Sequence, residues 1–364
     1  MKAVAIQVGK SGTARVVHIP DPVPERGEQL LRVLQVGIDG TDRELDSGEY
    51  GAAPAGESEL VIGHESLAQV VDSNELAAGF DAGELVVATV RRPCPPFCLN
   101  CRNGQPDFCL TGEYTERGIK GAHGFLAQAY CERPEFLVRV PPELRQVGVL
   151  VEPLSIVEKA FGQISSIQRR TVWRPHRVLI TGAGSIGVLA AILARLRGLD
   201  TLVYSLGELQ GVREELFGEL GIQYVDARKL PLEDAARQLG APDIAIEATG
   251  HSPLAWQVAG SLARNGVACL LSVTGGEGEA TIPSDELNNR MVLGNRLVFG
   301  AVNAQRQDFE EAIEDLIAIE ERWPGLLDRF ITRRLRMESI REALAGNDPS
   351  DLKTVIELGE GNGD

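Results

Sequence analysis

Four of the six cysteines in this 364-residue chain lie within one short segment. Their spacing, from Cys94 through Cys98 and Cys101 to Cys109, is C-x3-C-x2-C-x7-C. Four thiolates satisfy tetrahedral Zn²⁺ and leave no position open for a substrate, so the pattern predicts a structural zinc site. The alternative is a loose loop that holds four reduced cysteines without a metal.

A glycine-rich stretch, residues 182–187, is the second segment with a chemical signature. An apolar run at 178–180 precedes it, and a sequence with helix-forming composition follows it up to Gly198. A G-x-G-x-x-G turn between a strand and a helix binds the pyrophosphate of a dinucleotide on the free N–H groups of that helix. The alternative is a glycine turn in another kind of α/β protein. The residues expected to bind the cofactor here are Gly182, Gly184, Ser185, Ile186 and Gly187.

Polar residues in three other places are further candidates for catalysis or metal binding. Asp39 and Thr41 lie at the end of an expected strand, and His64 and Glu65 follow another. Loops at strand ends are frequent positions for binding and catalytic groups. His64 counts as a ligand only if its partners converge on it, because an isolated histidine is more often structural. Glu152, in an apolar stretch at a helix start, is either a solvated acid or a partly buried ligand.

The elements that must position these residues fall into two groups. Apolar or alternating runs with poor helical periodicity occupy residues 1–90, which favours a barrel-like β domain. From residue 177 to about 302, strands alternate with helices as in a doubly wound sheet. The runs of the first group are 1–8, 14–19, 29–36, 66–71 and 85–90, and 121–130 and 136–141 are expected to be two paired strands. The strands of the second group are 178–180, 201–205, 224–226, 243–250, 267–273 and 297–300, and helices are expected from 151 and over 309–321.

Composition narrows the classes of partner. The formal net charge of −16 argues against nucleic acid and anionic membranes, because phosphate binding needs a basic surface. The sequence shows no signal peptide at its start and no apolar run long enough to span a bilayer, which predicts a cytoplasmic protein. The excess of acids, and of arginine over lysine, fits either a salt-adapted cytoplasm or a GC-rich genome.

Together these segments resemble the zinc-dependent medium-chain dehydrogenase/reductase superfamily, and within it the glucose 1-dehydrogenase branch. The resemblance covers nearly the whole chain in order. It implies an α/β fold with an N-terminal GroES-like β-rich catalytic domain and a doubly wound Rossmann dinucleotide-binding domain. The implied limits are 1–172 with 305–364 for the catalytic domain, 92–110 for its zinc lobe and 173–304 for the Rossmann domain. The matching segments are 36–42, 61–65, 91–92, 104–109, 115–119, 152–156, 247–250 and 300–303.

The resemblance also implies a catalytic zinc held by Asp39, His64 and Glu152, with Glu65 beside them. Most of the superfamily has a cysteine where Asp39 stands, but an aspartate oxygen is an accepted and harder Zn²⁺ ligand. The metal would act as a Lewis acid on the substrate hydroxyl while a hydride moves to the nicotinamide. Thr41 matches the hydroxyl that relays the proton.

The same resemblance implies the substrate and its contacts. Glu116 and Asn303 match sugar-contacting positions, and Thr41 and Glu152 are counted with the substrate as well. Asn303 and Thr249 are also expected beside the cofactor. The implied reaction is oxidation of an aldose, D-glucose to D-glucono-1,5-lactone, with NAD(P)⁺.

Three alternatives or additions remain open from the sequence. One rival is a polyol or secondary-alcohol dehydrogenase of the same superfamily. Another is a non-enzymatic nucleotide-binding redox sensor or structural protein, which predicts cofactor binding without a catalytic metal. The resemblance also implies a homodimer or homotetramer, for which residues 297–299 are a candidate apolar sheet edge.

Cofactor choice depends on the loop after the second Rossmann strand. An acid there binds the ribose hydroxyls of NAD, whereas arginine accommodates the phosphate of NADP. Gly207 and Glu208 occupy this loop, where the resembling NADP-dependent enzymes carry adjacent arginines at Glu208 and Leu209. A carboxylate at Glu208 repels a phosphate dianion, and the next base is Arg213. The sequence therefore predicts a preference for NAD, with NADP as a second possibility.

Overall fold

A computed structural model describes residues 1–72, 79–273, 278–346, 348 and 350–358. The chain forms two compact units, one comprising Met1–Ser155 with Asn303–Asp364 and the other Ile156–Val302. The first division falls inside helix α3 (Val151–Gln168), whereas the sequence placed the domain limit after residue 172. The first turn of α3 therefore belongs to the unit that also contains Asp39 and His64.

The first unit is built on antiparallel β-structure. Its main sheet has the order β11-β6-β5-β3-β19-β18, with β10 also paired to β3, and two three-stranded sheets have the orders β2-β1-β4 and β7-β8-β9. Its strands are β1 (Lys2–Gln7), β2 (Arg15–His18), β3 (Gln29–Ile38), β4 (Glu59–Val61), β5 (Glu65–Asp72), β6 (Leu85–Ala88), β7 (Arg91–Arg92), β8 (Thr115–Arg117), β9 (Gly121–Ala122), β10 (Ala129–Glu132), β11 (Leu137–Val140), β18 (Arg333–Arg336) and β19 (Thr354–Glu357).

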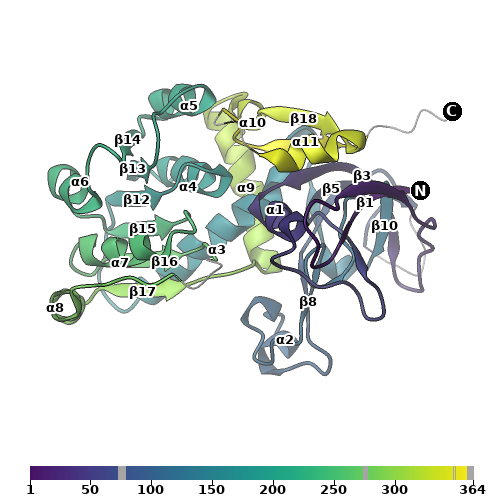
Figure 1. Cartoon of the computed structure of the whole chain (residues 1–364), viewed down its shortest axis with the longest axis horizontal. Helices are drawn as coiled ribbons and strands as arrows, with labels where there is room; N and C mark the ends of the chain where they lie inside the picture. The colour runs from purple at the N-terminus through teal and green to yellow at the C-terminus, as the bar shows by residue number, and fades with distance from the viewer. Residues whose placement is uncertain (73–78, 274–277, 347, 349, 359–364) are drawn as a thin grey trace. The chain divides into compact units, whose positions relative to one another are not determined.

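Helices and 3₁₀ turns lie between these strands in the sequence. The α-helices are α1 (Gly40–Ser47), α2 (Leu99–Arg102), α9 (Arg306–Arg322), α10 (Leu326–Phe330) and α11 (Ile340–Ala345). The 3₁₀ turns are η1 (Pro106–Phe108), η2 (Pro134–Phe136), η3 (Pro142–Leu144), η4 (Gly148–Leu150) and η5 (Met337–Ser339). Figure 1 shows the loops around α2 projecting away from the sheets of this unit.

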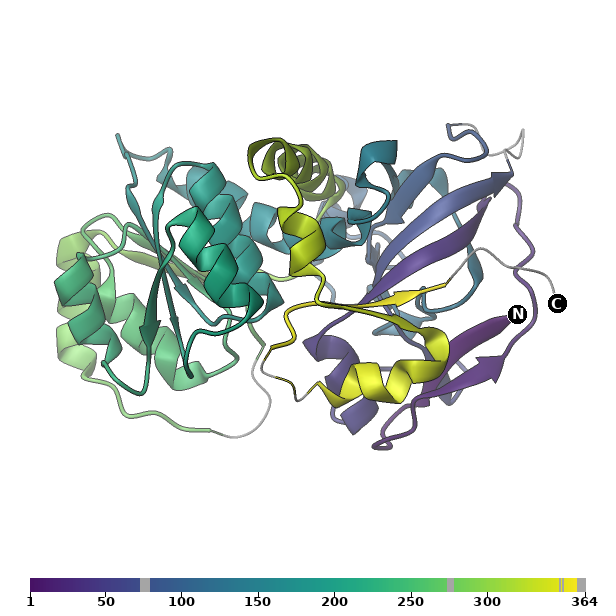
Figure 2. The ribbon, with the colours of Figure 1, turned by 90° about the horizontal axis from the view of Figure 1, so that it is seen from above.

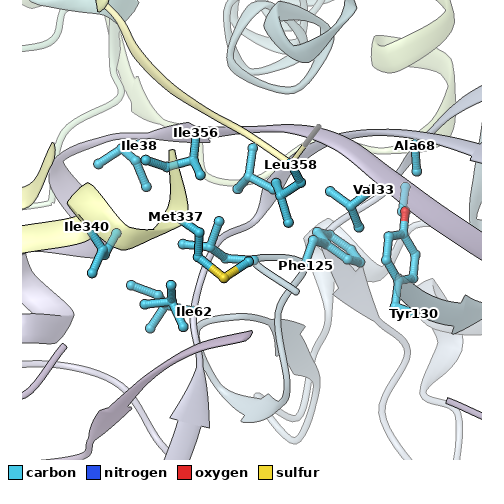
Figure 3. Close-up of a cluster of buried hydrophobic side chains, with 14 of the residues drawn as sticks. Val33, Ile38, Ile62, Ala68, Phe125, Tyr130, Met337, Ile340, Ile356 and Leu358 are labelled. Atoms are coloured by element: carbon cyan, nitrogen blue, oxygen red, sulfur yellow. The ribbon is translucent and has the colours of Figure 1, made fainter. Parts of the chain in front are cut away.

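Segments from both ends of the chain complete the main sheet. Strand β19 runs antiparallel to β3, with Thr354 opposite Ile38, so the yellow C-terminal elements lie beside the purple β3 in Figure 1. Leu31, Val33, Val36 and Ile38 of β3 belong to one buried cluster, and a register shift after Val33 separates the two pairs. Figure 3 shows Val33 and Ile38 of β3 in it, together with Met337 and Ile356 from the C-terminal part. Burial of this shared apolar surface holds the two distant segments together.

Two details of this unit differ from the sequence prediction. Residues 40–47 form α1, a helix that the poor apolar periodicity of the region did not predict. The predicted pairing of 121–130 with 136–141 is wrong, because β10 pairs with β3 and β11 pairs with β6. Each of these strands finds its partner in the N-terminal half of the chain, and the turn η2 separates them.

The second unit is a doubly wound sheet, as predicted. Its parallel strands have the order β14-β13-β12-β15-β16-β17, and Figure 2 shows helices on both faces of the sheet. The strands are β12 (Arg177–Thr181), β13 (Asp200–Ser205), β14 (Gln223–Asp226), β15 (Ile244–Glu247), β16 (Val267–Leu270) and β17 (Leu297–Gly300). The helices besides α3 are α4 (Ser185–Leu196), α5 (Val212–Leu220), α6 (Leu232–Leu239), α7 (Ser252–Ser261) and α8 (Ser284–Gly294).

Within the described part of the chain, each helix is too short or too polar to cross a lipid bilayer.

Candidate active site

Asp39 caps the first helix of the β-rich unit. Its Oδ1 accepts a hydrogen bond from the N–H of Asp42 at 3.2 Å, and Asp42 Oδ2 accepts one from the N–H of Asp39 at 3.1 Å. This reciprocal capping box satisfies two N–H groups that the helix leaves open. The Thr41 hydroxyl donates to Asp39 Oδ2 at 3.3 Å. The D-G-T-D sequence thus forms a helix start that fixes the Asp39 carboxylate and places a hydroxyl against it.

His64 lies against this helix start. Its Nε2 is 3.7 Å from Asp39 Oδ2, and its Nδ1 is 4.0 Å from Asp42 Oδ1. Asp42 also accepts the Gly63 N–H at 3.2 Å, so it ties the G-H-E loop to the helix. The ligand atoms of Asp39, His64 and Glu65 all lie within 4.8 Å of one another. The partners of His64 therefore converge on it, as its interpretation as a ligand required.

Glu65 has a buried cationic partner that the sequence analysis missed. Lys353 Nζ contacts Glu65 Oε2, and the two side chains are only 1% and 2% exposed. Lys353 Nζ also donates to the carbonyl of Ile38 at 3.4 Å. Gly37 leaves room for this pair, since a Cβ at that position would lie 1.7 Å from Glu65 Oε2. Lys353 immediately precedes β19, so only the pairing of β19 with β3 brings it here.

Glu152 interacts electrostatically with Asp39, His64 and Glu65. Burial, together with the charges of Glu65 and Asp39, raises the pKa of Glu152 to about 8 against the opposing charge of His64. Glu152 is not one of the three residues whose ligand atoms lie within 4.8 Å of one another, but it is near enough for the charges of those three residues to shift its pKa. It is a buried residue, and its interpretation as a solvated helix-start acid is therefore wrong.

The carboxylates around His64 differ in their proton affinity. Burial raises the pKa of Asp42 to about 7. Burial also opposes ionisation of Asp39, yet the charges of His64 and Lys353 hold its pKa well below the usual range. Asp39, Asp42 and Glu152 in turn raise the pKa of His64 well above its ordinary value, against the effect of burial.

This donor set fits a divalent cation. It combines a buried imidazole with the carboxylates of Asp39 and Glu65, whose charges raise the pKa of Glu152, and His64 Nδ1 has no hydrogen-bond partner among the described residues. Imidazole nitrogen and carboxylate oxygen are ordinary Zn²⁺ ligands. A 2+ charge among Asp39, His64, Glu65 and Glu152 would stabilise the ionised carboxylates.

Glu116 and Asn303, expected at the substrate, lie together. Asn303 Nδ2 donates to Glu116 Oε1 at 3.1 Å, and both residues belong to the β-rich unit. Arg91, which lies in one of the matching segments but was given no role from the sequence, forms a buried ion pair with the same oxygen at 2.9 Å. The backbone of Asn303 has φ of 60°, a left-handed conformation that asparagine tolerates better than most residues.

The four clustered cysteines converge as their spacing predicts. Their sulfurs all lie within 4.8 Å of one another, and Cys94 Sγ is 3.7 Å from Cys101 Sγ. The N–H of Cys98 points at Cys94 Sγ at 3.2 Å, and that of Leu110 points at Cys98 Sγ at 3.5 Å. Backbone N–H groups of Cys101 and Leu110 lower the pKa of Cys98 to about 6, whereas burial raises that of Cys101 to about 12. Four convergent thiols with N–H donors aimed at sulfur fit tetrahedral Zn²⁺.

The glycine turn of the second unit joins β12 to α4. Gly182 has φ of 100°, and a Cβ there would lie 2.6 Å from the carbonyl of Ala248. A Cβ at Gly187 would lie 2.1 Å from the carbonyl of Gly182, so both positions require glycine. Gly184 is the N-cap residue of α4, which Ser185 and Ile186 begin, and the space around Gly184 is open. These features suit a phosphate at the helix N-terminus.

The other residues expected at the cofactor have defined partners. Thr249, after β15, donates its N–H to Glu247 Oε1 at 2.7 Å. Gly207, after β13, donates its N–H to Asp226 Oδ1 at 3.2 Å. Glu208 lies 3.2 Å from Lys229 Nζ, and these side chains are 71% and 67% exposed. Asn303, by contrast, belongs to the other compact unit.

The fold and the two ligand clusters define a class of protein, a dehydrogenase built from a GroES-like unit and a Rossmann unit. The family described as "Alcohol dehydrogenase GroES-like domain" matches residues 25–142. The family described as "Glucose dehydrogenase C-terminus" matches residues 145–358. The chain belongs to the glucose dehydrogenase branch of the zinc-dependent medium-chain dehydrogenase/reductase superfamily, as the sequence predicted.

Individual relatives agree with this assignment. The glucose 1-dehydrogenase of Methanocella arvoryzae is 44% identical over 359 residues, which cover 99% of this chain and 100% of the relative. Glucose 1-dehydrogenase 1 of Haloterrigena turkmenica is 36% identical over 98% of this chain and 99% of its own length. The structure of Haloferax mediterranei glucose dehydrogenase in complex with NADP, Zn and gluconolactone has a TM-score of 0.91 and 34% identity, covering 99% of this chain and 100% of that one. The predicted fold class is confirmed.

The buried pair of Lys353 and Glu65 yields a stability prediction. Replacement Lys353→Met leaves the Glu65 carboxylate buried without its cation, which we expect to lower the free energy of unfolding by about 3–5 kcal/mol. Chemical denaturation measures this change. The exposed pair of Lys229 and Glu208 supplies the control, since Lys229→Met should cost less than about 1 kcal/mol. The double variant Glu65→Gln/Lys353→Met should recover part of the loss, and equal small losses for both lysine variants would contradict the assignment.

Proposed function

We propose that this protein is a zinc-dependent glucose 1-dehydrogenase that oxidises D-glucose to D-glucono-1,5-lactone. The observation that carries the proposal is the full-length similarity to glucose 1-dehydrogenases, 44% identity over 99% of the chain in one of them. The buried cluster of Asp39, His64 and Glu65, with Glu152 beside it, supports a catalytic metal in this chain.

The residues of the β-rich unit have different roles at this site. Asp39, His64 and Glu152 hold the zinc in this proposal, and Glu65 stands next to them in its ion pair with Lys353. When bound, zinc makes the C1 hydroxyl more acidic and the oxidised nicotinamide accepts a hydride. Thr41 keeps its hydroxyl on Asp39 Oδ2, a position from which it receives the substrate proton.

In this proposal Glu116 and Asn303 bind the sugar. Asn303 and Arg91 both donate to Glu116 Oε1. Its Oε2 has no hydrogen-bond donor among the described residues, which leaves that oxygen to accept from sugar hydroxyls. The negative charge of the carboxylate makes these hydrogen bonds stronger than neutral ones.

A substrate panel tests the proposed reaction. The purified, zinc-loaded enzyme should reduce the nicotinamide cofactor with D-glucose, and less readily with sorbitol, threonine or 2,3-butanediol. We expect this because Glu116 and Asn303, which are hydrogen-bonded to each other, occupy positions that contact the sugar in the glucose dehydrogenases this chain resembles. Absorbance of the reduced nicotinamide gives kcat/KM for each substrate. Activity on polyols or secondary alcohols with none on any aldose would replace the proposal by its rival. Cofactor binding without any turnover would favour a non-enzymatic role.

Metal analysis of two variants separates the two zinc sites. We expect about two zinc ions per chain, one of them held by four thiolates in a structural site. His64→Ala should remove one ion and lower kcat/KM by at least roughly a hundredfold, as loss of support at metal sites does. Cys101→Ser should remove the other ion and lower the melting temperature, while the molecules that stay folded retain turnover. A Cys101→Ser variant with full stability and no turnover would contradict the structural assignment of the lobe.

The loop after β13 bears on the choice between NAD and NADP. The predicted preference for NAD is not supported, because the similar Haloferax mediterranei enzyme was solved in complex with NADP. In this chain Lys229 lies 3.2 Å from Glu208 and offsets its charge. Arg228 pairs with Asp226 at 2.7 Å, and Arg213 Nε donates to the carbonyl of Ala183 in the glycine turn at 2.7 Å. We propose that these three cations let the loop accept the phosphate of NADP.

Cofactor kinetics test this part of the proposal. Lys229→Gln and Arg228→Gln should each lower kcat/KM for NADP by about tenfold, the effect of one lost charge-assisted hydrogen bond, and leave NAD unchanged. Arg237→Gln is the matched control, because Arg237 pairs with Glu233 and Asp234 within its own helix α6. The measurement is kcat/KM for both cofactors with glucose at one salt concentration. A wild-type preference for NAD would restore the interpretation based on Glu208.

We propose that the chain forms oligomers through the edge of the Rossmann sheet at β17. Strand β17 ends the order of the Rossmann sheet, and on its outer side no described strand pairs with it. Leu297, Val298 and Phe299 there are partly buried. An apolar edge strand is a template for pairing with another chain, which supports a homodimer or homotetramer. The cytoplasmic location stays a prediction from the sequence.

A further inference from the structure

Arg91 is the structural partner of the proposed sugar-binding carboxylate. Strand β7 pairs with β8 so that Arg91 stands directly opposite Glu116. Arg91 Nε lies 3.0 Å and Nη2 2.9 Å from Glu116 Oε1, and the two side chains are 3% and 6% exposed. Asn303 Nδ2 is a third donor to the same oxygen at 3.1 Å. Three donors on one oxygen fix the rotation of the carboxylate and therefore the direction of Oε2.

The other side of the Arg91 guanidinium is attached to the cysteine lobe. Its Nη1 donates to the carbonyl of Asp107 at 3.1 Å, two residues before the zinc-ligand candidate Cys109. The guanidinium carbon lies 3.7 Å from the centroid of the Tyr114 ring, in the segment that leaves the lobe. A planar guanidinium can stack on a ring while its rigid fork of donors holds two acceptors in fixed directions, whereas an ammonium has neither the planar face nor the fork. Arg91 thus joins the lobe to Glu116.

We propose that Arg91 is a positioning residue for substrate binding, through which the folded cysteine lobe sets the orientation of the Glu116 carboxylate. The proposal rests on the proposed function, because it takes Glu116 as the sugar-binding acid. In this proposal the folded lobe affects substrate binding as well as the stability of the protein. Disturbing the lobe at Asp107, or the adjoining segment at Tyr114, moves Arg91, and moving Arg91 releases Glu116 from its fixed rotation.

Arg91→Lys tests the proposal in the zinc-loaded enzyme. A lysine keeps the positive charge but loses the two-nitrogen contact and the stacking, so we expect the KM for glucose to rise by about tenfold. The kcat should change by less than about threefold and the cofactor KM by less than about twofold, since neither depends on Glu116 in this scheme. Arg92→Lys is the matched control. Arg92 follows in the same strand but pairs with Glu132 and lies over Phe136. The KM of the Arg92→Lys enzyme for glucose should therefore match that of the wild type.

Two further comparisons separate positioning from loss of folding. If Arg91 acts through Glu116, Arg91→Lys should add almost nothing to the KM of Glu116→Gln, whereas independent effects would multiply. Tyr114→Leu should raise the glucose KM by about threefold because it removes the ring, and Tyr114→Phe should leave it unchanged because it keeps the ring.

The outcomes distinguish this inference from the proposed function. Oxidation of glucose by the wild type tests the function alone. If the wild type oxidises another alcohol instead, the proposed function fails, and the same variants are measured with that alcohol. An unchanged substrate KM in Arg91→Lys, multiplicative effects with Glu116→Gln, or equal effects of Arg91→Lys and Arg92→Lys would each overturn the inference. A wild type that oxidises no alcohol would overturn both.

Discussion

The end of strand β3 is the place on which the candidate active site depends. Gly37 pairs there with Glu65 of β5, and the absence of a Cβ makes room for the Glu65 carboxylate. Ile38 pairs with Thr354, which brings Lys353 to the same point from the C-terminal part of the chain. Asp39 then leaves the strand and caps α1. One strand end thus positions a ligand candidate, makes room for its neighbour and receives the cation that offsets its charge.

Buried charge at this strand end explains why a metal fits. Removing a carboxylate from water is costly unless a cation or hydrogen bonds compensate it. Lys353 compensates Glu65, but burial and neighbouring acids still raise the pKa of Glu152 to about 8 and that of Asp42 to about 7. The fold therefore collects more buried acid than its own cations balance. A divalent ion bound here would supply the missing positive charge, and its binding would then be coupled to the stability of this region.

Patterns in the sequence predicted most strands and the cysteine cluster, whereas Asp39, His64 and Glu152 were grouped only by the family resemblance, and the residues that orient the candidate ligands were not predicted. Alternating apolar residues and cysteine spacing are local signals, so the β-rich unit, the Rossmann unit and the convergence of the four thiols were predictable. Helix α1 was not, because Leu45 is its only buried apolar residue and its start depends on the capping box between Asp39 and Asp42. Lys353 and Arg91 act through strand pairing between segments far apart in the sequence. No local pattern marks such partners.

The cofactor-binding segments also differ in how far the sequence predicts them. The glycine turn is determined by sterics, whereas phosphate recognition is determined by the charges of several residues. The shape of the glycine turn follows from sterics alone, because any side chain at Gly182 or Gly187 would collide with a backbone carbonyl. Glycine spacing in the sequence is therefore sufficient to predict it. Phosphate recognition depends instead on the summed charge around Glu208, and Lys229 reaches that residue from the loop after β14. A single acid after β13 is consequently weak evidence for NAD, since exposed charges act together over about a Debye length rather than one by one.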